Sequence, residues 1–191
     1  MTDWTTLRYV VVDVEGNGQQ PPDLVELAVV PIKGGEPGEP QSWLVRPEHP
    51  IKHLATAFHG IRTHDVAVCP PVAEIAAEVL AALDAPALVA HNAHVDVSVL
   101  RRALPGWEPP EVFDTLKLAR RLVPGLPAYK LGDLTERFQL AKDLPDGLKP
   151  HRAAYDTLVT ARLFTLLADR ADSLEELRGQ PPESVPDDAL F

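Results

Sequence analysis

Apolar residues in the first quarter of the chain occur in short runs. The runs at residues 7–13, 23–32 and 42–45 are separated by Gly and Pro residues. Short apolar runs bounded by such turn-forming residues are typical of buried strands. The pattern therefore predicts three consecutive strands joined as a meander.

The pattern changes to helical spacing after residue 50. Apolar residues at 71–83 recur every three or four positions, with Glu74 and Glu78 on the opposite face, which predicts a helix. Short apolar runs at 87–90 and 112–114 predict two more strands. Further helices are predicted at residues 95–103, 116–122, 131–138 and 153–167. This alternation of strands and helices indicates an α/β fold.

The composition changes again near the C-terminus. Beyond residue 168 the sequence is acidic and proline-rich, and it ends in PPESVPDDALF. Such a segment buries little apolar surface. We therefore predict one folded domain at residues 1–168, followed by a mobile tail at residues 169–191.

The remaining composition indicates a cytoplasmic protein with no membrane partner. Its single cysteine, Cys69, excludes an intramolecular disulfide and a zinc site built from cysteines. No apolar run approaches the ~18 residues of a membrane-spanning helix, and the start MTDWTTLR has no signal-peptide pattern.

Four carboxylates interrupt or follow the apolar elements. Asp13 and Glu15 end the first strand two residues apart, so their side chains share one face of the sheet. Asp96 follows the 87–90 strand, and Asp156 lies within the last long helix, five residues after His151. Each carboxylate alone is most simply a helix cap or a solvated loop group. Several oxygen ligands that converge, however, are what Mg²⁺ or Mn²⁺ selects.

Three motifs carry these residues: DVE at 13–15, HNAHVD at 91–96 and HRAAYD at 151–156. In chemistry, order and spacing they resemble the DEDDh family of 3′-to-5′ exonucleases, which includes the proofreading epsilon subunit of bacterial DNA polymerase III and ribonuclease T. Segments 59–61, 113–115 and 129–131 also resemble the family, and the similarity spans residues 8–168. Two positions depart from it, because an aromatic residue is common where Val95 stands and Thr or Ser where Gly16 stands.

The resemblance implies a ribonuclease H-like fold, with a five-stranded mixed sheet flanked by helices and its second strand antiparallel. It also implies two Mg²⁺ ions, with Mn²⁺ as a substitute, held by Asp13, Glu15, Asp96 and Asp156. His151 is the candidate general base, since an imidazole takes a proton readily near neutral pH. Five helical residues turn through about 140°, so we expect His151 on the loop that enters the helix rather than on the helix itself.

Four residues are candidate contacts for the terminal nucleotide: the backbone at Val14, the side chain of Asn92, and the rings of Phe58 and His59. Exposed rings can stack on a base. Lys130 and Arg152 are candidate phosphate contacts. His91 and His94 are interpreted as structural.

The function that these features favour is hydrolysis at the 3′ end of single-stranded DNA, with release of nucleoside monophosphates, in replication proofreading or repair. One alternative is an exonuclease for RNA or oligoribonucleotides, because contacts to a 2′-hydroxyl cannot be placed from sequence. Another is a non-catalytic nucleic-acid binding module. The terminal residues Leu190 and Phe191 resemble peptides that bind a sliding clamp, so a clamp or a DNA polymerase is a candidate partner.

The charge balance at first opposes a nucleic-acid partner. The chain has 28 acidic and 18 basic residues, a net charge of −10. Residues 101–152 nevertheless carry a local excess of positive charge, and the tail holds much of the acidity. This distribution predicts a salt-sensitive hold on a short single-stranded end rather than a broad duplex-binding surface.

Overall fold

Six strands form one mixed sheet in the computed structural model, which describes residues 3–179. The strands are β1 (Tyr9–Gly16), β2 (Leu24–Lys33), β3 (Glu36–Pro37), β4 (Gln41–Leu44), β5 (Ala87–Ala90) and β6 (Glu111–Asp114). Their order is β3-β2-β1-β5-β6, and β4 also pairs with β2. β2 is antiparallel to β1, whereas β5 and β6 run parallel to it.

This arrangement confirms the mixed sheet and its antiparallel second strand. The sheet has one strand more than the expected five because β3 and β4 both pair with the same edge of β2. Residues 38–40, Gly-Glu-Pro, interrupt the chain between them, and proline cannot donate a hydrogen bond to a sheet.

Seven α-helices and one 3₁₀ helix complete the described fold. They are η1 (Trp4–Thr6), α1 (His53–His59), α2 (Val72–Ala82), α3 (His94–Ala103), α4 (Thr115–Leu122), α5 (Leu131–Phe138), α6 (Ala153–Ala168) and α7 (Leu174–Leu177). The five helices expected from the sequence agree with α2 to α6 within one residue at each end. The sequence pattern missed α1, whose Leu54 and Phe58 are exposed, so the helix shows no buried apolar stripe.

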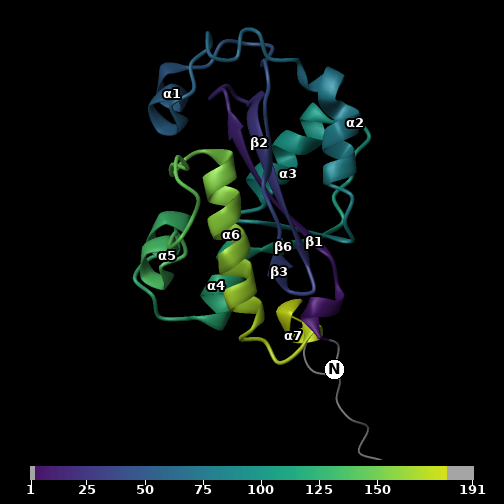
Figure 1. Cartoon of the computed structure of the whole chain (residues 1–191), viewed down its shortest axis with the longest axis vertical. Coiled ribbons are helices and arrows are strands. Elements are labelled where there is room, and N and C mark those ends of the chain that lie inside the picture. Colours follow the sequence, from purple (N-terminus) through teal and green to yellow (C-terminus); the bar gives the residue numbers. More distant parts are fainter. Residues whose placement is uncertain (1–2, 180–191) are drawn as a thin grey trace, which may run out of the picture.

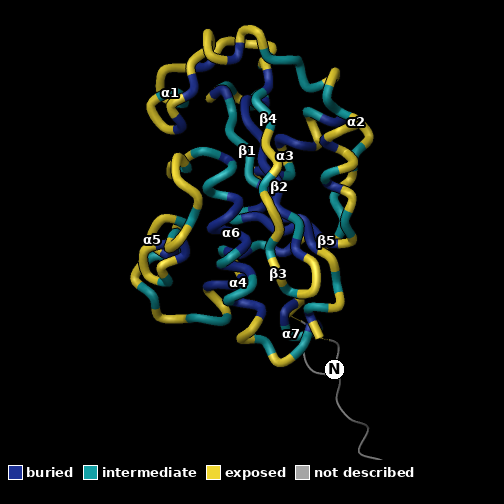
Figure 2. Tube along the Cα trace, viewed as in Figure 1, coloured by how far each residue is buried: buried dark blue, intermediate teal, exposed yellow. Residues whose placement is uncertain are grey.

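The helices cover both faces of the sheet. Figure 1 shows α4, α5 and α6 on one side and α2 and α3 on the other. Alternate residues of β1 pack on opposite faces of the sheet. Tyr9 and Val11 pack in the α6 layer, and Val10 and Val12 pack in the α2 and α3 layer. Figure 2 shows the buried residues concentrated in the sheet and along α6.

The packed fold continues past the predicted domain boundary at residue 168. In α7, Leu174 and Leu177 are buried in the α6 layer, and the Ser173 hydroxyl accepts a hydrogen bond from the Glu176 N–H at 3.1 Å. The prediction of a mobile tail from residue 169 is therefore wrong as far as residue 179, because two leucines supply an apolar face. Residues 180–191, including the candidate clamp-binding Leu190 and Phe191, lie outside the described residues.

Within residues 3–179, no helix combines the length and hydropathy that crossing a bilayer requires.

Candidate active site

The carboxyl end of β1 and the start of α6 bring three carboxylates together. Asp13 and Glu15 continue the β1 face that packs against α6, and Asp156 lies in the first turn of that helix. Carboxylate oxygens of these three residues all lie within 4.8 Å of one another. The strand period of two and the tertiary packing of α6 together produce this cluster.

Asp96 approaches β1 from the opposite layer. β1 pairs with β5 only at residues 9–11, and β5 ends at Ala90, so the carboxyl end of β1 extends beyond β5. Asp96, in the first turn of α3, is 5% exposed and accepts a hydrogen bond from the Val14 N–H at 3.1 Å. Asp96 therefore borders the cluster, and its negative charge also raises the pKa of Asp13.

Burial and mutual repulsion make the ionised cluster costly without a cation. Burial is the largest cause that raises the pKa of each carboxyl group. The pKa of Asp13 lies well above its ordinary range, and the pKa values of the other three rise to about 8 for Glu15, about 7 for Asp96 and about 6 for Asp156. Neighbouring carboxylates add to the increase for Asp13 and Glu15. A set of hard oxygen donors that repel one another fits a divalent cation.

His151 lies in the turn immediately before α6, as the helix geometry predicted. Its backbone has a φ of 61°, in the left-handed region that a residue other than glycine rarely adopts. The side chain is exposed, and both its positive form and a backbone hydrogen bond from His151 lower the pKa of Asp156, so the two residues lie close together. The His151 and Phe58 ring centroids are 4.2 Å apart.

Phe58 and His59 have different environments at the end of α1. Phe58 is 64% exposed, whereas His59 is only 5% exposed. The His59 Nδ1 accepts the Ile61 N–H at 3.1 Å, so its Nε2 carries the proton that is donated to the Gly16 carbonyl at 3.2 Å. The prediction that His59 stacks on a base is wrong, because its buried ring instead fastens α1 to the end of β1.

Asn92 and His91 lie in the turn between β5 and α3. Asn92 has a φ of 66°, which asparagine tolerates better than most residues, and its N–H donates to Asp114 Oδ1 at 3.0 Å. The His91 ring bridges the Thr115 hydroxyl at 2.9 Å and the Tyr129 carbonyl at 3.1 Å. Its structural interpretation is confirmed.

Gly16 departs from the family pattern for a steric reason. A β-carbon at this position would lie 2.9 Å from the Pro22 Cβ. The β1–β2 pairing is irregular between Glu15 and Gly16, so the chain bends where it leaves the cluster. The other departure, Val95, is 45% exposed on α3.

The sequence reasoning missed Glu26. This carboxylate lies on β2, is 4% exposed, and binds the guanidinium of Arg152. The Arg152 guanidinium is therefore paired with Glu26, although its side chain is 38% exposed, and it is not a free phosphate contact as predicted, whereas Lys130 is exposed. A single Glu within the otherwise apolar run of β2 was the available signal, since a buried charge requires a partner.

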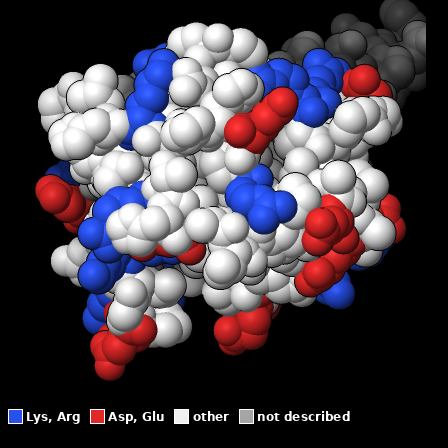
Figure 3. Space-filling model, turned by 90° about the horizontal axis from the view of Figure 1, so that it is seen from above, with Lys and Arg blue, Asp and Glu red and all other residues white. Residues whose placement is uncertain are grey.

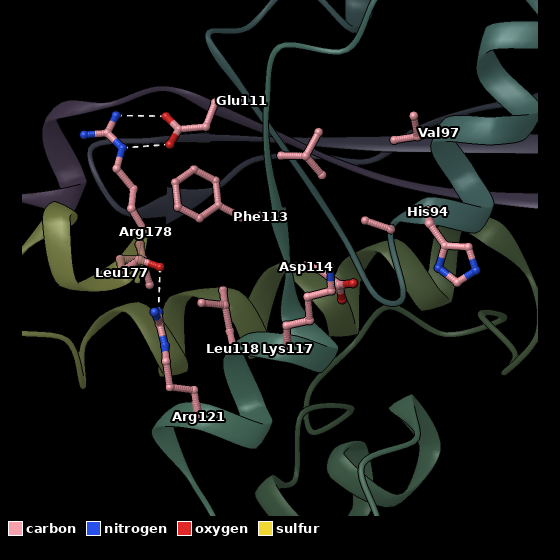
Figure 4. Close-up of a pocket in the computed structure, with 12 residues that line it drawn as sticks. His94, Val97, Glu111, Phe113, Asp114, Lys117, Leu118, Arg121, Leu177 and Arg178 are labelled. Atoms are coloured by element: carbon pink, nitrogen blue, oxygen red, sulfur yellow. Dashed lines mark hydrogen bonds and ion pairs between the residues drawn. The ribbon is translucent and has the colours of Figure 1, made fainter. Parts of the chain in front are cut away.

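The surface around the site carries both signs of charge. Figure 3 shows the end of the molecule at which β1 finishes and α6 begins, and Lys and Arg side chains there are interspersed with Asp and Glu. A hollow of about 480 Å³ lies elsewhere, along the open edge of β6 (Figure 4). Neither the three clustered carboxylates nor Asp96 lines this hollow.

The known proteins that this chain resembles include exonucleases. A family model described as Exonuclease matches residues 10–164. The 3′-5′ exonuclease DinG of Bacillus subtilis is 35% identical over 181 residues, which cover 91% of this chain and 18% of the relative. Exodeoxyribonuclease 10 of Escherichia coli is 35% identical over 175 residues, which cover 90% of this chain and 75% of that protein.

A solved structure of Exonuclease X in complex with 5′ overhanging duplex DNA has the same fold. It superposes with a TM-score of 0.72 and 36% sequence identity, covering 84% of this chain and 91% of that chain. The chain thus spans most of two of these similar proteins but less than a fifth of DinG.

Proposed function

This chain belongs to the exonuclease family, and on this premise we propose that it hydrolyses single-stranded DNA from the 3′ end and releases nucleoside monophosphates. The observation that carries the proposal is the convergence of Asp13, Glu15 and Asp156 beside the exposed imidazole of His151. The names of two similar proteins, an exodeoxyribonuclease and an exonuclease bound to DNA, support DNA as the substrate.

The carboxylate cluster would hold two divalent cations, Mg²⁺ or its substitute Mn²⁺. Asp13, Glu15 and Asp156 offer oxygens at mutual distances that suit shared coordination, and Asp96 borders the group. When bound, such ions supply the positive charge that activates a water molecule and stabilises the leaving 3′ oxygen. The raised pKa values of the metal-free carboxylates support this assignment. Repulsion between the carboxylates causes part of the increase, and a cation bound between them would replace this repulsion by attraction.

His151 would remove the proton from the attacking water. Its side chain is exposed to solvent, and it lies close enough to Asp156 to influence that group electrostatically. Carboxylates that bind a cation are poor bases, whereas a neutral imidazole accepts a proton near pH 7. This division of roles leaves the carboxylates to hold the cations and His151 to move the proton.

Phe58 and Asn92 would contact the terminal nucleotide. The Phe58 ring is 64% exposed although it contacts the His151 ring, so its exposed part could stack on a base. Asn92 lies in the turn that leads to Asp96, where its amide can hydrogen-bond a sugar or phosphate oxygen. The β1 backbone at Val14, whose N–H is bound to Asp96, would contact the nucleotide as well.

The test compares 3′ and 5′ end-labelled single-stranded DNA, the matched RNA, and dinucleotides, each with Mg²⁺ and with a chelator. We expect mononucleotides from DNA, formed from the 3′ end, and no product from the Asp156→Ala variant. Faster degradation of RNA or dinucleotides would assign the protein to the RNA exonuclease class. Binding without cleavage of any substrate would favour the non-catalytic module.

We further propose a role in replication proofreading or repair. A proofreading enzyme removes a mispaired 3′ terminus faster than a paired one, since the mispaired strand is already free to enter a single-strand site. Primer–template duplexes that differ only in the terminal base pair would measure this preference. Equal rates on both would contradict the proofreading role and leave the exonuclease activity standing.

A further inference from the structure

Glu26 and Arg152 form an ion pair that joins β2 to the turn before α6. The Arg152 Nε lies 2.9 Å from Glu26 Oε2, and its Nη2 lies 2.6 Å from Oε1. Glu26 Oε2 also accepts the Ala153 N–H at 3.0 Å. One buried carboxylate thus binds a guanidinium fork and a free N–H at the start of a helix, where negative charge is favoured.

The ion pair fixes the backbone directly after His151. Arg152 has an extended conformation with a φ of −126°, and the α6 helix begins at the next residue. His151 itself has a φ of 61°, a conformation that persists only when its surroundings enforce it. The two residues that follow it, Arg152 and Ala153, are both bound to Glu26, so the enforcement comes from β2.

Glu26 also lies next to the carboxylate cluster. In the β1–β2 ladder Glu26 is the partner of Glu15, and side chains of partner residues lie on the same face. Glu26 therefore approaches the cluster, but Arg152 and the helix N–H occupy its carboxylate. Its position links the strand beside the cluster to the turn that carries the candidate base.

We propose that Glu26 is a positioning residue, which acts through Arg152 to hold the turn that carries His151 beside Asp156 of the carboxylate cluster. This inference rests on the proposed function, in which His151 is the general base. Side chains that react must be held close to their productive geometry, and small displacements of them cost much of the rate. Glu26 touches neither the substrate nor the reacting water.

The experiment measures kcat and KM on a single-stranded DNA oligonucleotide with saturating Mg²⁺ for the Glu26→Gln variant, which keeps the side-chain volume. We expect kcat to fall about 10- to 100-fold, with KM and Mg²⁺ affinity within about threefold of the unaltered protein. In a His151→Ala background the same substitution should change kcat less than about twofold, because the residue it positions is gone. A loss of equal size in both backgrounds would overturn the proposal.

Two further variants keep the test independent of a folding defect. Arg152→Lys retains the positive charge but cannot form the two parallel hydrogen bonds, so we expect a smaller loss of kcat, again only when His151 is present. Glu111→Gln is the matched control, because Glu111 binds the guanidinium of Arg178 at 2.7 and 2.8 Å beside the hollow along β6 (Figure 4). The kcat of Glu111→Gln should equal that of the unaltered protein. If kcat instead falls as far as in Glu26→Gln, the loss is a general result of breaking an Arg–Glu pair and the proposal fails.

A measurement without substrate separates this inference from the proposed function. Amide hydrogen exchange in the metal-free protein should accelerate at residues 151–153 in Glu26→Gln and stay unchanged there in Glu111→Gln. Unchanged exchange in both would overturn the positioning role. If the unaltered protein degrades no nucleic acid, the proposed function fails, whereas faster exchange would still show that Glu26 holds the turn.

Discussion

Removing one carboxylate from the cluster should stabilise the metal-free protein. Burial, followed by the charges of Asp156 and Glu26, raises the pKa of Glu15 from 4.5 to about 8. At pH values below 4.5 the group is protonated in both the folded and the unfolded chain and has no effect. As the pH rises towards 8, the unfolded chain releases the proton while the folded chain retains it, so the free energy of unfolding falls. Above about pH 8 the loss is constant.

The size of this loss follows from the pKa difference. At 1.36 kcal/mol for each pH unit, the difference corresponds to about 5 kcal/mol. Water reaches part of the Glu15 side chain and screens its charge, so we expect about 2 kcal/mol. The variant Glu15→Gln keeps the shape of the side chain and cannot ionise, so it should recover this free energy.

The assay is urea unfolding in a chelator, followed by tryptophan fluorescence between pH 4 and pH 9. Glu15→Gln should be about 2 kcal/mol more stable than the unaltered protein at pH 8.5 and equally stable near pH 4. Glu39→Gln, in the exposed loop between β3 and β4, is the control and should have no effect at either pH. The reasoning is refuted if Glu15→Gln is no more stable at pH 8.5, or if its advantage is the same at pH 4.

Saturating Mg²⁺ should reverse the order of stability. A ligand that binds only the folded state adds about 2.7 kcal/mol when its concentration is 100 times its dissociation constant. The unaltered protein gains this stabilisation, whereas Glu15→Gln lacks one of the ligands and gains less. If Mg²⁺ raises the free energy of unfolding equally in both proteins, Glu15 is not a ligand of the metal.

The remaining predictions concern the base, the stacking ring and the turn. His151→Ala should lower kcat by about 10²- to 10⁴-fold with Mg²⁺ affinity retained, measured by titration calorimetry, while the exposed His53→Ala has no effect. Phe58→Ala should weaken binding of a single-stranded oligonucleotide by about 1–3 kcal/mol in fluorescence anisotropy, and equal weakening by Leu54→Ala on the same helix would argue against base stacking. Gly16→Ser should lower the free energy of unfolding by about 1–3 kcal/mol, because its Cβ would lie 2.9 Å from a proline ring; undiminished stability in urea would contradict that steric reason.

The spacing of apolar residues was sufficient to predict the helices and strands that have an apolar side. β1, β2 and the helices α2 to α6 all contribute apolar residues to the two core layers, and their patterns predicted them. The pattern failed at α1, which exposes its large apolar side chains, and at α7, where only two leucines are buried. Short elements contribute few positions to a periodic pattern, so neighbouring contacts decide whether they form.

The identities of the cluster residues were also available from the sequence. Asp13 and Glu15 share a face by the strand period, and the spacing from His151 to Asp156 excluded a common helical face. The sequence also showed a carboxylate at position 26 within an apolar strand. Nothing local indicated its partner, because Arg152 lies 126 residues away.

Only the tertiary structure decided which of these groups meet and which are occupied. Packing of α6 on β1 brings Asp156 to Asp13 and Glu15, whereas Asp96 reaches Val14 where β1 extends beyond the end of β5. The same packing removed His59 from the candidate substrate contacts, because its ring is buried and hydrogen-bonded, and Arg152 from the free phosphate contacts, because its guanidinium is bound to Glu26. The sequence by itself determined the chemistry of the side chains and the face on which each emerges. Their distances, burial and partners depend on long-range packing, which local periodicity does not encode.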